Sequence, residues 1–378
     1  MSHSPPWGFA KTVFMINFLF QGLAVGLKSL LVFALFYMVK TKLDAVEASY
    51  IILNFSAAVV ASVLLSFGQD QVFILKKSIK VPYSIMYIRF CWMLLLSVGF
   101  FLGWIPFAFI LTTFGLMFLL EIKSCAKYSM KHKWDAIANL LALLLFILFS
   151  YYTDDYATAF GISVFFGALP VWLNMIEISR DIHFNFRFYF QFLISGLLFY
   201  SFLNIDWIFF KYLGNSVEFT DYALAQKIAL NLSLIATIMG SVVIGWTSAI
   251  NNKRVIIYYF LGGTVALLIY LLVPYFLLRI FMVGDGTLSG IYLWFLVLLL
   301  LRFVLSWAEL PLKREGSPLI RIYTASAILM MYLAIGMFLF RLSGAVGLVQ
   351  AMIGVHVLYI TFLFLYNYKF KLWNRTYE

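Results

Sequence analysis

The chain has 378 residues, of which 64% are hydrophobic and 11% are charged, and its mean hydropathy is +0.97. Soluble domains are about half apolar and about a quarter charged, so this composition excludes an ordinary soluble enzyme or binding domain. A net charge of +11 would suggest nucleic acid in a soluble protein. Here the basic residues lie between apolar runs, which indicates membrane topology, and no nucleic-acid partner is expected.

Apolar runs separated by polar breaks predict twelve transmembrane helices. Each predicted helix boundary is accurate to about three residues. In chain order they cover residues 12–38, 46–67, 84–104, 106–122, 136–152, 157–175, 187–210, 220–247, 256–279, 288–308, 320–340 and 345–366. Two junctions are tight. One lies at Gly103–Pro106, where proline ends the helix, and the other at Arg341–Gly344.

The distribution of basic residues predicts the orientation of these helices. Of the 27 Lys and Arg residues, 18 fall in the termini and in alternate loops, five fall in the other loops, and four lie inside spans. Because cytoplasmic loops carry an excess of Lys and Arg, we expect both termini to be cytoplasmic.

The two halves of the chain are weakly similar. Residues 46–50 (VEASY) lie near the second span of the first half, and residues 217–222 (VEFTDY) lie near the second span of the second half. Six helices on each side would enter the membrane in the same direction, a parallel repeat known from transporters. We therefore predict an all-α membrane protein with an N-terminal lobe at 1–180 and a C-terminal lobe at 181–378.

Four cations lie inside the predicted spans, where a charge at the bilayer centre costs about 2.5–3.5 kcal/mol and is rarely left facing lipid. Together they suggest a pathway for an anion. With the polar residues beside them, the candidate substrate-binding residues are Lys28, Gln21, Lys227, Asn231, Arg302 and Arg89.

The spacing of these residues along their helices supports some of them more strongly than others. Gln21 and Lys28 share one helix face, and Lys227 and Asn231 lie four residues apart. The alternative for Lys28 is a side chain that snorkels to the membrane surface. Snorkelling is the stronger alternative for Arg89, which is close to the cytoplasmic end of its span.

Asp206 is the only acid that the span map places well inside the membrane, near the outer end of span seven. It is close enough along the predicted hairpin to pair with Lys227. We interpret the two either as a gating ion pair that opens during transport or as a structural pair.

A basic stripe follows span four, with Lys123, Lys127 and Lys131 at intervals of four residues. Such a stripe is typical of an anchor to anionic headgroups. The alternative is that it collects a phosphorylated lipid from the inner leaflet.

Catalytic constellations are missing from the sequence. The four histidines are scattered without metal-ligand spacing, and the chain has no nucleotide-binding phosphate loop. The pair Asp154 and Asp155 is typical of a solvated turn in a short outer loop. No cofactor, metal site or enzymatic activity is expected.

Three segments carry a family resemblance: Ser66–Lys77 (SFGQDQVFILKK); Asn204–Ala225, with an aspartate, a glycine turn and a Tyr-x-x-Ala; and Gly344–Ala351. In their order and spacing they resemble the bacterial O-antigen and polysaccharide flippase branch of the multidrug/oligosaccharidyl-lipid/polysaccharide (MOP) exporter superfamily. With the twelve spans, the resemblance covers nearly the whole chain.

The resemblance implies a V-shaped fold of two six-helix lobes around a central cavity, working by alternating access. It implies an undecaprenyl-pyrophosphate-linked oligosaccharide, turned from the cytoplasmic to the periplasmic leaflet of a bacterial inner membrane. Membrane lipids, a glycan polymerase and a chain-length regulator are the partners it suggests. Lys28 and Lys227 fall where the family places cavity-lining basic residues.

Two rival functions remain open. A multidrug/cation antiporter of the same superfamily shares the fold but usually needs buried acids. A membrane glycan polymerase or ligase usually needs a large outer loop, and the outer segments here, such as 211–219 and 281–287, are short.

Overall fold

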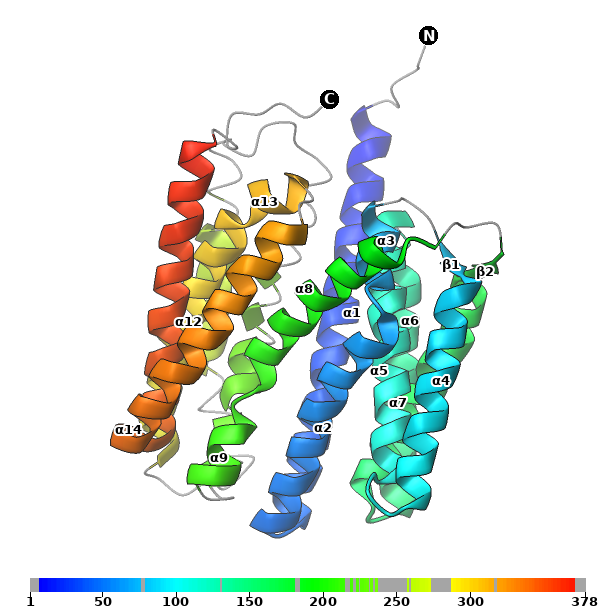
Figure 1. Cartoon of the computed structure of the whole chain (residues 1–378), viewed down its shortest axis with the longest axis horizontal. Coiled ribbons are helices and arrows are strands. Elements are labelled where there is room, and N and C mark those ends of the chain that lie inside the picture. Colours follow the sequence, from blue (N-terminus) through cyan, green and yellow to red (C-terminus); the bar gives the residue numbers. More distant parts are fainter. Residues whose placement is uncertain are drawn as a thin grey trace. The chain divides into compact units, whose positions relative to one another are not determined.

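The computed structural model describes residues 7–75, 79–129, 131–180, 184–214, 287–315 and 318–370, together with residue 257, residues 260–272 and short stretches between 218 and 236. This part of the chain is almost entirely helical (Figure 1). Its main helices are α1 (Trp7–Lys42), α2 (Ala45–Ser66), α3 (Gln69–Leu75), α4 (Tyr83–Phe101), α5 (Phe107–Ser129), α6 (His132–Tyr152), α7 (Tyr156–Met175), α8 (Phe186–Asn204), α9 (Trp207–Leu213), α12 (Thr287–Ala308), α13 (Leu310–Glu315) and α14 (Pro318–Lys369). Two short strands, β1 (Lys80–Pro82) and β2 (Glu177–Ser179), accompany them.

Nine of the described helices are long and apolar enough to cross a membrane. One of them, α14, contains non-helical backbone at Ser343 and Gly344 and therefore comprises two spans. These helices match ten of the twelve predicted spans. The other two predictions, 220–247 and 256–279, are described only in part, and the second contains the shorter apolar helix Phe260–Leu272. The prediction of an all-α, multi-pass membrane protein is confirmed.

Both predicted tight junctions interrupt the helical backbone. Gly103 has a φ of 72°, and α5 begins directly after Pro106. At the second junction Gly344 has a φ of 56°, a conformation that side chains rarely adopt. The Glu218 carboxylate accepts a hydrogen bond from the Ala345 backbone N–H at 2.7 Å, which caps the helix that follows.

The chain divides into two compact units, each of which contains parts of α1 and α2. The first unit comprises Met1–Leu35 and Ala61–Leu193, and the second comprises Phe36–Val60 and Ile194–Glu378. The lobe boundary near residue 180 stays a prediction.

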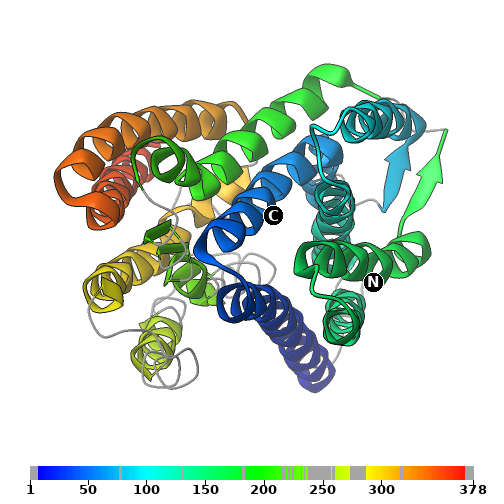
Figure 2. The same cartoon turned by 90° about the horizontal axis from the view of Figure 1, so that it is seen from below.

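In the first unit α5, α6 and α7 run side by side (Figure 2). Small residues make this packing close. A Cβ atom added to Gly167 of α7 would lie 2.5 Å from the backbone nitrogen of Ala142, and one added to Gly115 of α5 would lie 2.7 Å from the carbonyl carbon of Val164. Such contacts between small residues are the usual way in which helices pack inside a membrane.

One end of the first unit carries a two-stranded parallel sheet, which the sequence did not predict because three-residue strands show no usable alternation. The two strands lie side by side (Figure 2). Lys80 pairs in register with Glu177, and their charged atoms are 3.7 Å apart. The guanidinium of Arg180 lies 5.0 Å from the centroid of the Tyr83 ring. The pairing agrees with the prediction that both segments lie on the same side of the membrane.

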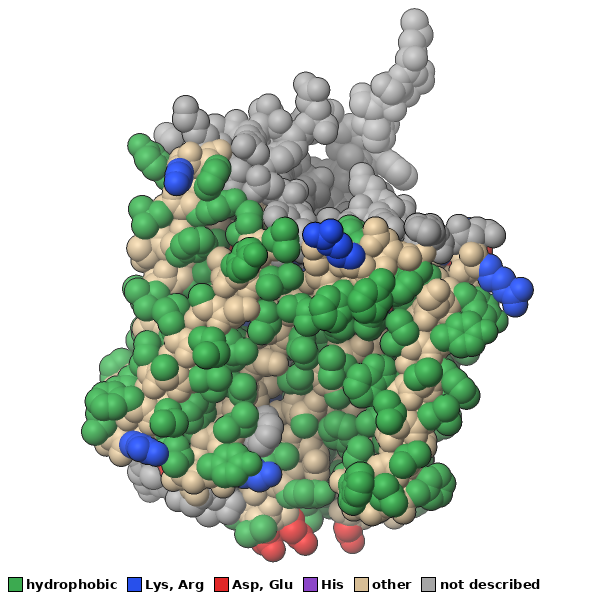
Figure 3. Space-filling view, in the orientation of Figure 1, with side chains coloured by type: hydrophobic (Ala, Val, Ile, Leu, Met, Phe, Trp, Pro, Cys, Tyr) green, Lys and Arg blue, Asp and Glu red, His purple; other side chains and the backbone are tan. Residues whose placement is uncertain are grey.

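The outer face of α4 is apolar along its whole length, as Figure 3 shows where this helix forms the surface. Its exposed side chains include Tyr87, Phe90, Leu94, Leu95 and Val98. A helix with such a face suits contact with lipid chains.

In the second unit α12 packs against α14. Leu305 and Ala308 form a buried apolar cluster with Leu312 of α13 and Ile360 of α14. The hairpin of α1 and α2 also contributes to this unit, where the rings of Phe36 and Phe55 meet edge to face with centroids 6.0 Å apart.

The predicted topology can be tested by labelling. In a variant with Cys91 and Cys125 replaced by serine, single cysteines at Ser78 and Asn215 are expected to react from opposite sides of the membrane. An impermeant maleimide applied to intact cells should label the cysteine at 215, and the cysteine at 78 only after permeabilisation. Labelling of both positions from the same side would contradict the twelve-span map.

Candidate functional site

Lys28 lies in the middle of α1 and is half-buried, and Gln21 lies two turns earlier and is buried. Both belong to the first unit. The charge of Lys28 interacts with Asp135 of α6, a carboxylate that is only 5% exposed. The sequence did not predict this acid as a partner, although Asp135 and Asn139 lie one turn apart at the start of an apolar run.

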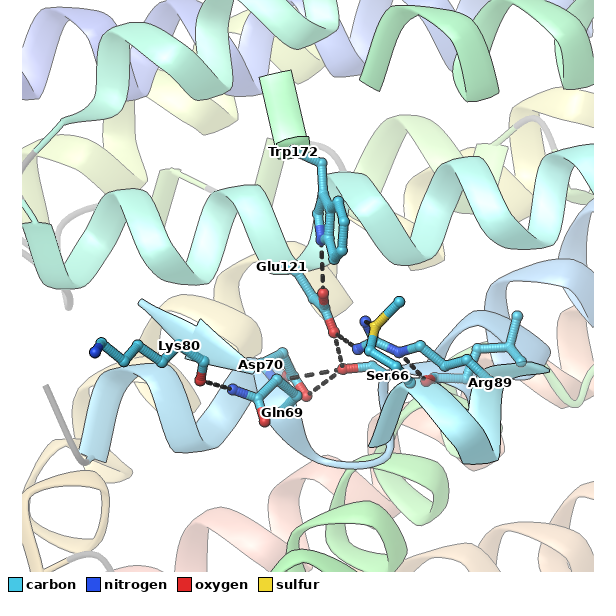
Figure 4. A network of polar contacts seen from close by, with 9 residues as sticks. Ser66, Gln69, Asp70, Lys80, Arg89, Glu121 and Trp172 are labelled. Atoms are coloured by element: carbon cyan, nitrogen blue, oxygen red, sulfur yellow. Dashed lines mark hydrogen bonds and ion pairs between the residues drawn. The ribbon is translucent and has the colours of Figure 1, made fainter. Parts of the chain in front are cut away.

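Arg89 of α4 is 4% exposed and forms a buried ion pair with Glu121 of α5. Its Nε also donates a hydrogen bond to the Leu65 carbonyl oxygen at 3.1 Å. Figure 4 shows Glu121 between Arg89 and Trp172, whose indole N–H donates to the second carboxylate oxygen at 2.8 Å. Neither role predicted for Arg89, substrate binding or snorkelling, includes this ion pair.

The same network reaches the turn between α2 and α3. The Ser66 hydroxyl lies 3.4 Å from Glu121 and 3.2 Å from Asp70, so one hydroxyl connects two carboxylates (Figure 4). Gln69 donates to the Lys80 carbonyl oxygen at 3.1 Å. This network ties α2, α3, α4, α5 and α7 together, and it gives the Ser66–Asp70 motif a structural role.

Three acids besides Asp206 are buried in the described residues. Glu121 is fully buried, and Asp135 and Asp70 are nearly so. Glu121 was not predicted because it is a single acid near the end of an apolar run, where spacing alone does not reveal a partner on another helix.

In the second unit Asp206, between α8 and α9, is buried and accepts three hydrogen bonds. The donors are the hydroxyl of Tyr222 at 2.9 Å, the amide of Gln226 and the hydroxyl of Tyr332 from α14. A carboxylate that accepts several hydrogen bonds is stabilised in its charged form. Tyr332 was not predicted, because it is more than a hundred residues away in sequence.

Lys227 donates a hydrogen bond to the Asn204 side-chain oxygen at 2.9 Å and lies 5.6 Å from the centroid of the Phe55 ring. It also interacts electrostatically with Asp206. The structure thus brings the two charges into one cluster while giving each its own hydrogen-bond partners. Their role as a gating ion pair stays a prediction.

Arg302 of α12 interacts electrostatically with Asp206 and Glu309. Among the described residues its Nε has no hydrogen-bond partner. His356 of α14 lies within electrostatic reach of Arg302, and its Nδ1 is 2.8 Å from the Met352 carbonyl oxygen. Asn231, the remaining predicted residue, lies outside the described residues.

The predicted site residues therefore fall into three groups. Gln21 and Lys28 lie in the first unit, with Asp135 near Lys28; Lys227 and Arg302 lie around Asp206 in the second; and Arg89 belongs to a buried structural network. The central acid of each group, Asp135, Asp206 or Glu121, has a cation beside it.

The coupling of Asp206 and Lys227 can be measured in a double-mutant cycle. Asp206→Asn and Lys227→Gln are each expected to lower the thermal stability of the purified protein, because each leaves a buried charge with less compensation. The double variant should lose less than the sum, with a coupling of about 0.5–3 kcal/mol. Lys211→Gln, at an exposed lysine of α9, serves as the control and should combine additively with Asp206→Asn. Additivity in both cycles would show that the pair is not coupled.

Comparison with known proteins gives a likeness of fold. No family model and no curated protein matches the chain. Among solved structures, it is similar to a MATE transporter in complex with Br-NRF, with 11% identity, 96% of each chain covered and a TM-score of 0.55. It is also similar to an outward-facing multidrug resistance MATE family transporter of the MOP superfamily, with 12% identity, 96% of each chain covered and a TM-score of 0.54.

A third structure, a ligand complex of the MATE multidrug transporter DinF-BH, matches with 12% identity and a TM-score of 0.55 over 96% of this chain and 92% of that one. At such identities the likeness shows the fold alone. The chain therefore has a fold similar to that of these transporters.

Proposed function

We propose that this protein is a flippase that moves an undecaprenyl-pyrophosphate-linked oligosaccharide from the cytoplasmic to the periplasmic leaflet of a bacterial inner membrane. Alternating access through a cationic cavity would carry the substrate, with Lys28 and Lys227 as its main contacts. A glycan polymerase and a chain-length regulator are the partners that such a substrate requires downstream.

The balance of buried charge is the observation that carries this proposal. A cavity for a cationic drug needs an acid whose charge is available to the ligand. In the described residues Glu121 pairs with Arg89, Asp206 lies near Lys227 and Arg302, and Asp135 interacts with lysines. Cations within apolar helices cost free energy and usually mark a functional site, so the arrangement favours an anionic substrate.

Reconstitution tests the proposal. In phosphatidylcholine vesicles containing the protein, a fluorescent undecaprenyl-diphosphate disaccharide is expected to become accessible to a lectin on the opposite side. Empty vesicles and vesicles with heat-denatured protein serve as controls. Equal accessibility with and without the protein would contradict the flippase function.

A multidrug/cation antiporter is the second candidate, because the solved structures of similar fold include transporters of that type. The two functions predict opposite outcomes in one host strain. An antiporter should lower the cellular accumulation of the cationic dye ethidium and raise resistance to it. A flippase should leave ethidium accumulation unchanged and restore surface glycan in a strain that lacks its own flippase.

A further inference from the structure

Two charged residues of the second unit, Asp206 and Lys227, are each held by a neutral amide instead of by each other. The Gln226 amide donates a hydrogen bond to Asp206 Oδ2, and the Lys227 ammonium donates one to Asn204 Oδ1 at 2.9 Å. Asn204 and Asp206 are two residues apart in the chain, and Gln226 and Lys227 are adjacent. An ion pair would need only an exchange of partners between these neighbours, yet within the described residues Lys227 forms none.

The acceptor positions of Asp206 are occupied by other donors. Its Oδ1 accepts a hydrogen bond from the Tyr332 hydroxyl, and its Oδ2 accepts from Gln226 and from the Tyr222 hydroxyl at 2.9 Å. Such bonds stabilise a carboxylate in its charged form. Asp206 still interacts electrostatically with Lys227, and an opposite charge nearby lowers the cost of a cation among apolar helices. The acid therefore compensates Lys227 without binding its ammonium.

The amide of Asn204 is oriented by its own helix. Its Nδ2 donates a hydrogen bond to the Tyr200 carbonyl oxygen, one turn earlier in α8, at 2.8 Å. The opposite orientation of the amide would set an N–H group against the Lys227 ammonium, which can only donate. Asn204 is 7% exposed, so packing and hydrogen bonding together direct its Oδ1 at the lysine.

The other contact of the Lys227 ammonium is also neutral. It lies 5.6 Å from the centroid of the Phe55 ring, and a ring face attracts a cation without neutralising it. An ammonium has three N–H donors, and within the described residues Asn204 is the one hydrogen-bond acceptor of Lys227. Lys227 is half-buried, so it keeps its charge and its remaining donors for a ligand.

We propose that Asn204 is a positioning residue, which holds the Lys227 ammonium out of an ion pair with Asp206 so that it can bind the diphosphate of a lipid-linked sugar. The inference rests on the proposed function and identifies how one of its main contacts is kept available. Fixing a long lysine side chain costs rotamer freedom, and a contact that fixes it beforehand reduces this cost when the ligand binds. A neutral amide suits the task, because a carboxylate in its place would compete with the phosphate for the ammonium.

Asn204→Asp tests this role with a small change of shape. Binding of geranyl-diphospho-N-acetylglucosamine is measured on the full-length protein in phosphatidylcholine nanodiscs. The variant is expected to weaken this binding at least about tenfold, because the new carboxylate pairs with Lys227. Asn174→Asp is the matched control, since Asn174 is exposed and donates the same kind of hydrogen bond, to the Pro170 carbonyl oxygen at 2.9 Å. It should bind the probe like wild type.

A second variant separates the position of the carboxylate from the total charge. Asn204→Asp combined with Asp206→Asn moves the carboxylate by two residues and keeps the net charge of wild type. It should bind the probe as weakly as Asn204→Asp alone, because the partner of Lys227 decides the affinity. Binding like wild type would show that total charge alone matters and would overturn the proposal.

Asn204→Leu decides the question even if Asn204→Asp does not fold, because it keeps the size of the side chain and removes the acceptor. It should weaken probe binding about tenfold in the wild-type protein. In a Lys227→Gln background it should have no further effect, because Asn204 acts through Lys227. Equal losses in both backgrounds, or no loss in the first, would overturn the positioning role.

Phospholipid headgroups share the phosphodiester chemistry of the probe. If phosphatidylglycerol in the nanodisc displaces the probe from the wild-type protein, the anion that Lys227 holds is a headgroup, and the assignment to the substrate is overturned. Vesicle transport separates the two proposals. Wild-type protein that moves the lipid-linked glycan while Asn204→Asp moves it equally well contradicts the role of Asn204 and leaves the flippase function intact. Wild-type protein that binds the probe but moves no glycan contradicts the flippase function instead.

Discussion

Glu121→Gln and Arg89→Met are each expected to lower the free energy of unfolding by about 3–5 kcal/mol, because each leaves an unpaired charged or polar partner in a buried site. Glu121 is fully buried, pairs with Arg89, and accepts hydrogen bonds from Trp172 and Ser66. The double variant should recover a large part of the loss, since no charge is then stranded. Thermal unfolding in detergent, with the folded fraction followed by size-exclusion chromatography, measures these losses.

A matched control for this pair is available on the same unit. Lys80 and Glu177 form an ion pair that is about half exposed, and exposed pairs contribute at most about 1 kcal/mol. Glu177→Gln should therefore leave stability almost unchanged. If Glu121→Gln were as stable as Glu177→Gln, the buried network of Figure 4 would not hold α4 and α5 together.

Lys28→Ala is expected to abolish export of the lipid-linked glycan, with protein abundance close to wild type. The lost group is an anion contact rather than a packing contact, and Asp135 keeps Lys123, Lys127 and Asn139 as neighbours. Lys28→Arg should retain partial activity because it keeps the charge and changes its geometry. Surface glycan in a strain lacking its own flippase measures the effect.

Lys42→Ala provides the control for Lys28, because Lys42 is an exposed lysine in the last turn of the same helix. It should export like wild type. Normal export by Lys28→Ala would mean that this lysine snorkels to the membrane surface, and the cationic pathway would lose its central residue.

The two buried acid clusters of the first unit differ in their contacts. The network around Glu121 connects five elements and closes on itself, so it suits a rigid part of the unit. Asp135 interacts electrostatically with three lysines and is held by Asn139, whose amide oxygen has no hydrogen-bond partner among the described residues.

The membrane class, the helix breaks and most of the spans followed from the sequence alone. Apolar runs of sufficient length must form helices in a bilayer, because every backbone N–H and C=O needs a partner within its own segment. The breaks at Gly103–Pro106 and at Gly344 could be predicted for a similar local reason. Proline lacks the N–H that a continuing helix needs, and glycine readily adopts the positive φ found at Gly103 and Gly344.

The partners of the buried charges were decided only by the tertiary structure. Glu121 and Arg89 are 32 residues apart, and Tyr332 and Asp206 are 126 apart. A lone acid or arginine in an apolar run shows that a partner is needed, but spacing along one helix cannot say which other helix supplies it. The sequence therefore indicated that the cations within apolar runs need partners, while helix packing determined that Arg89 pairs with Glu121 and that the charge of Lys28 interacts with Asp135.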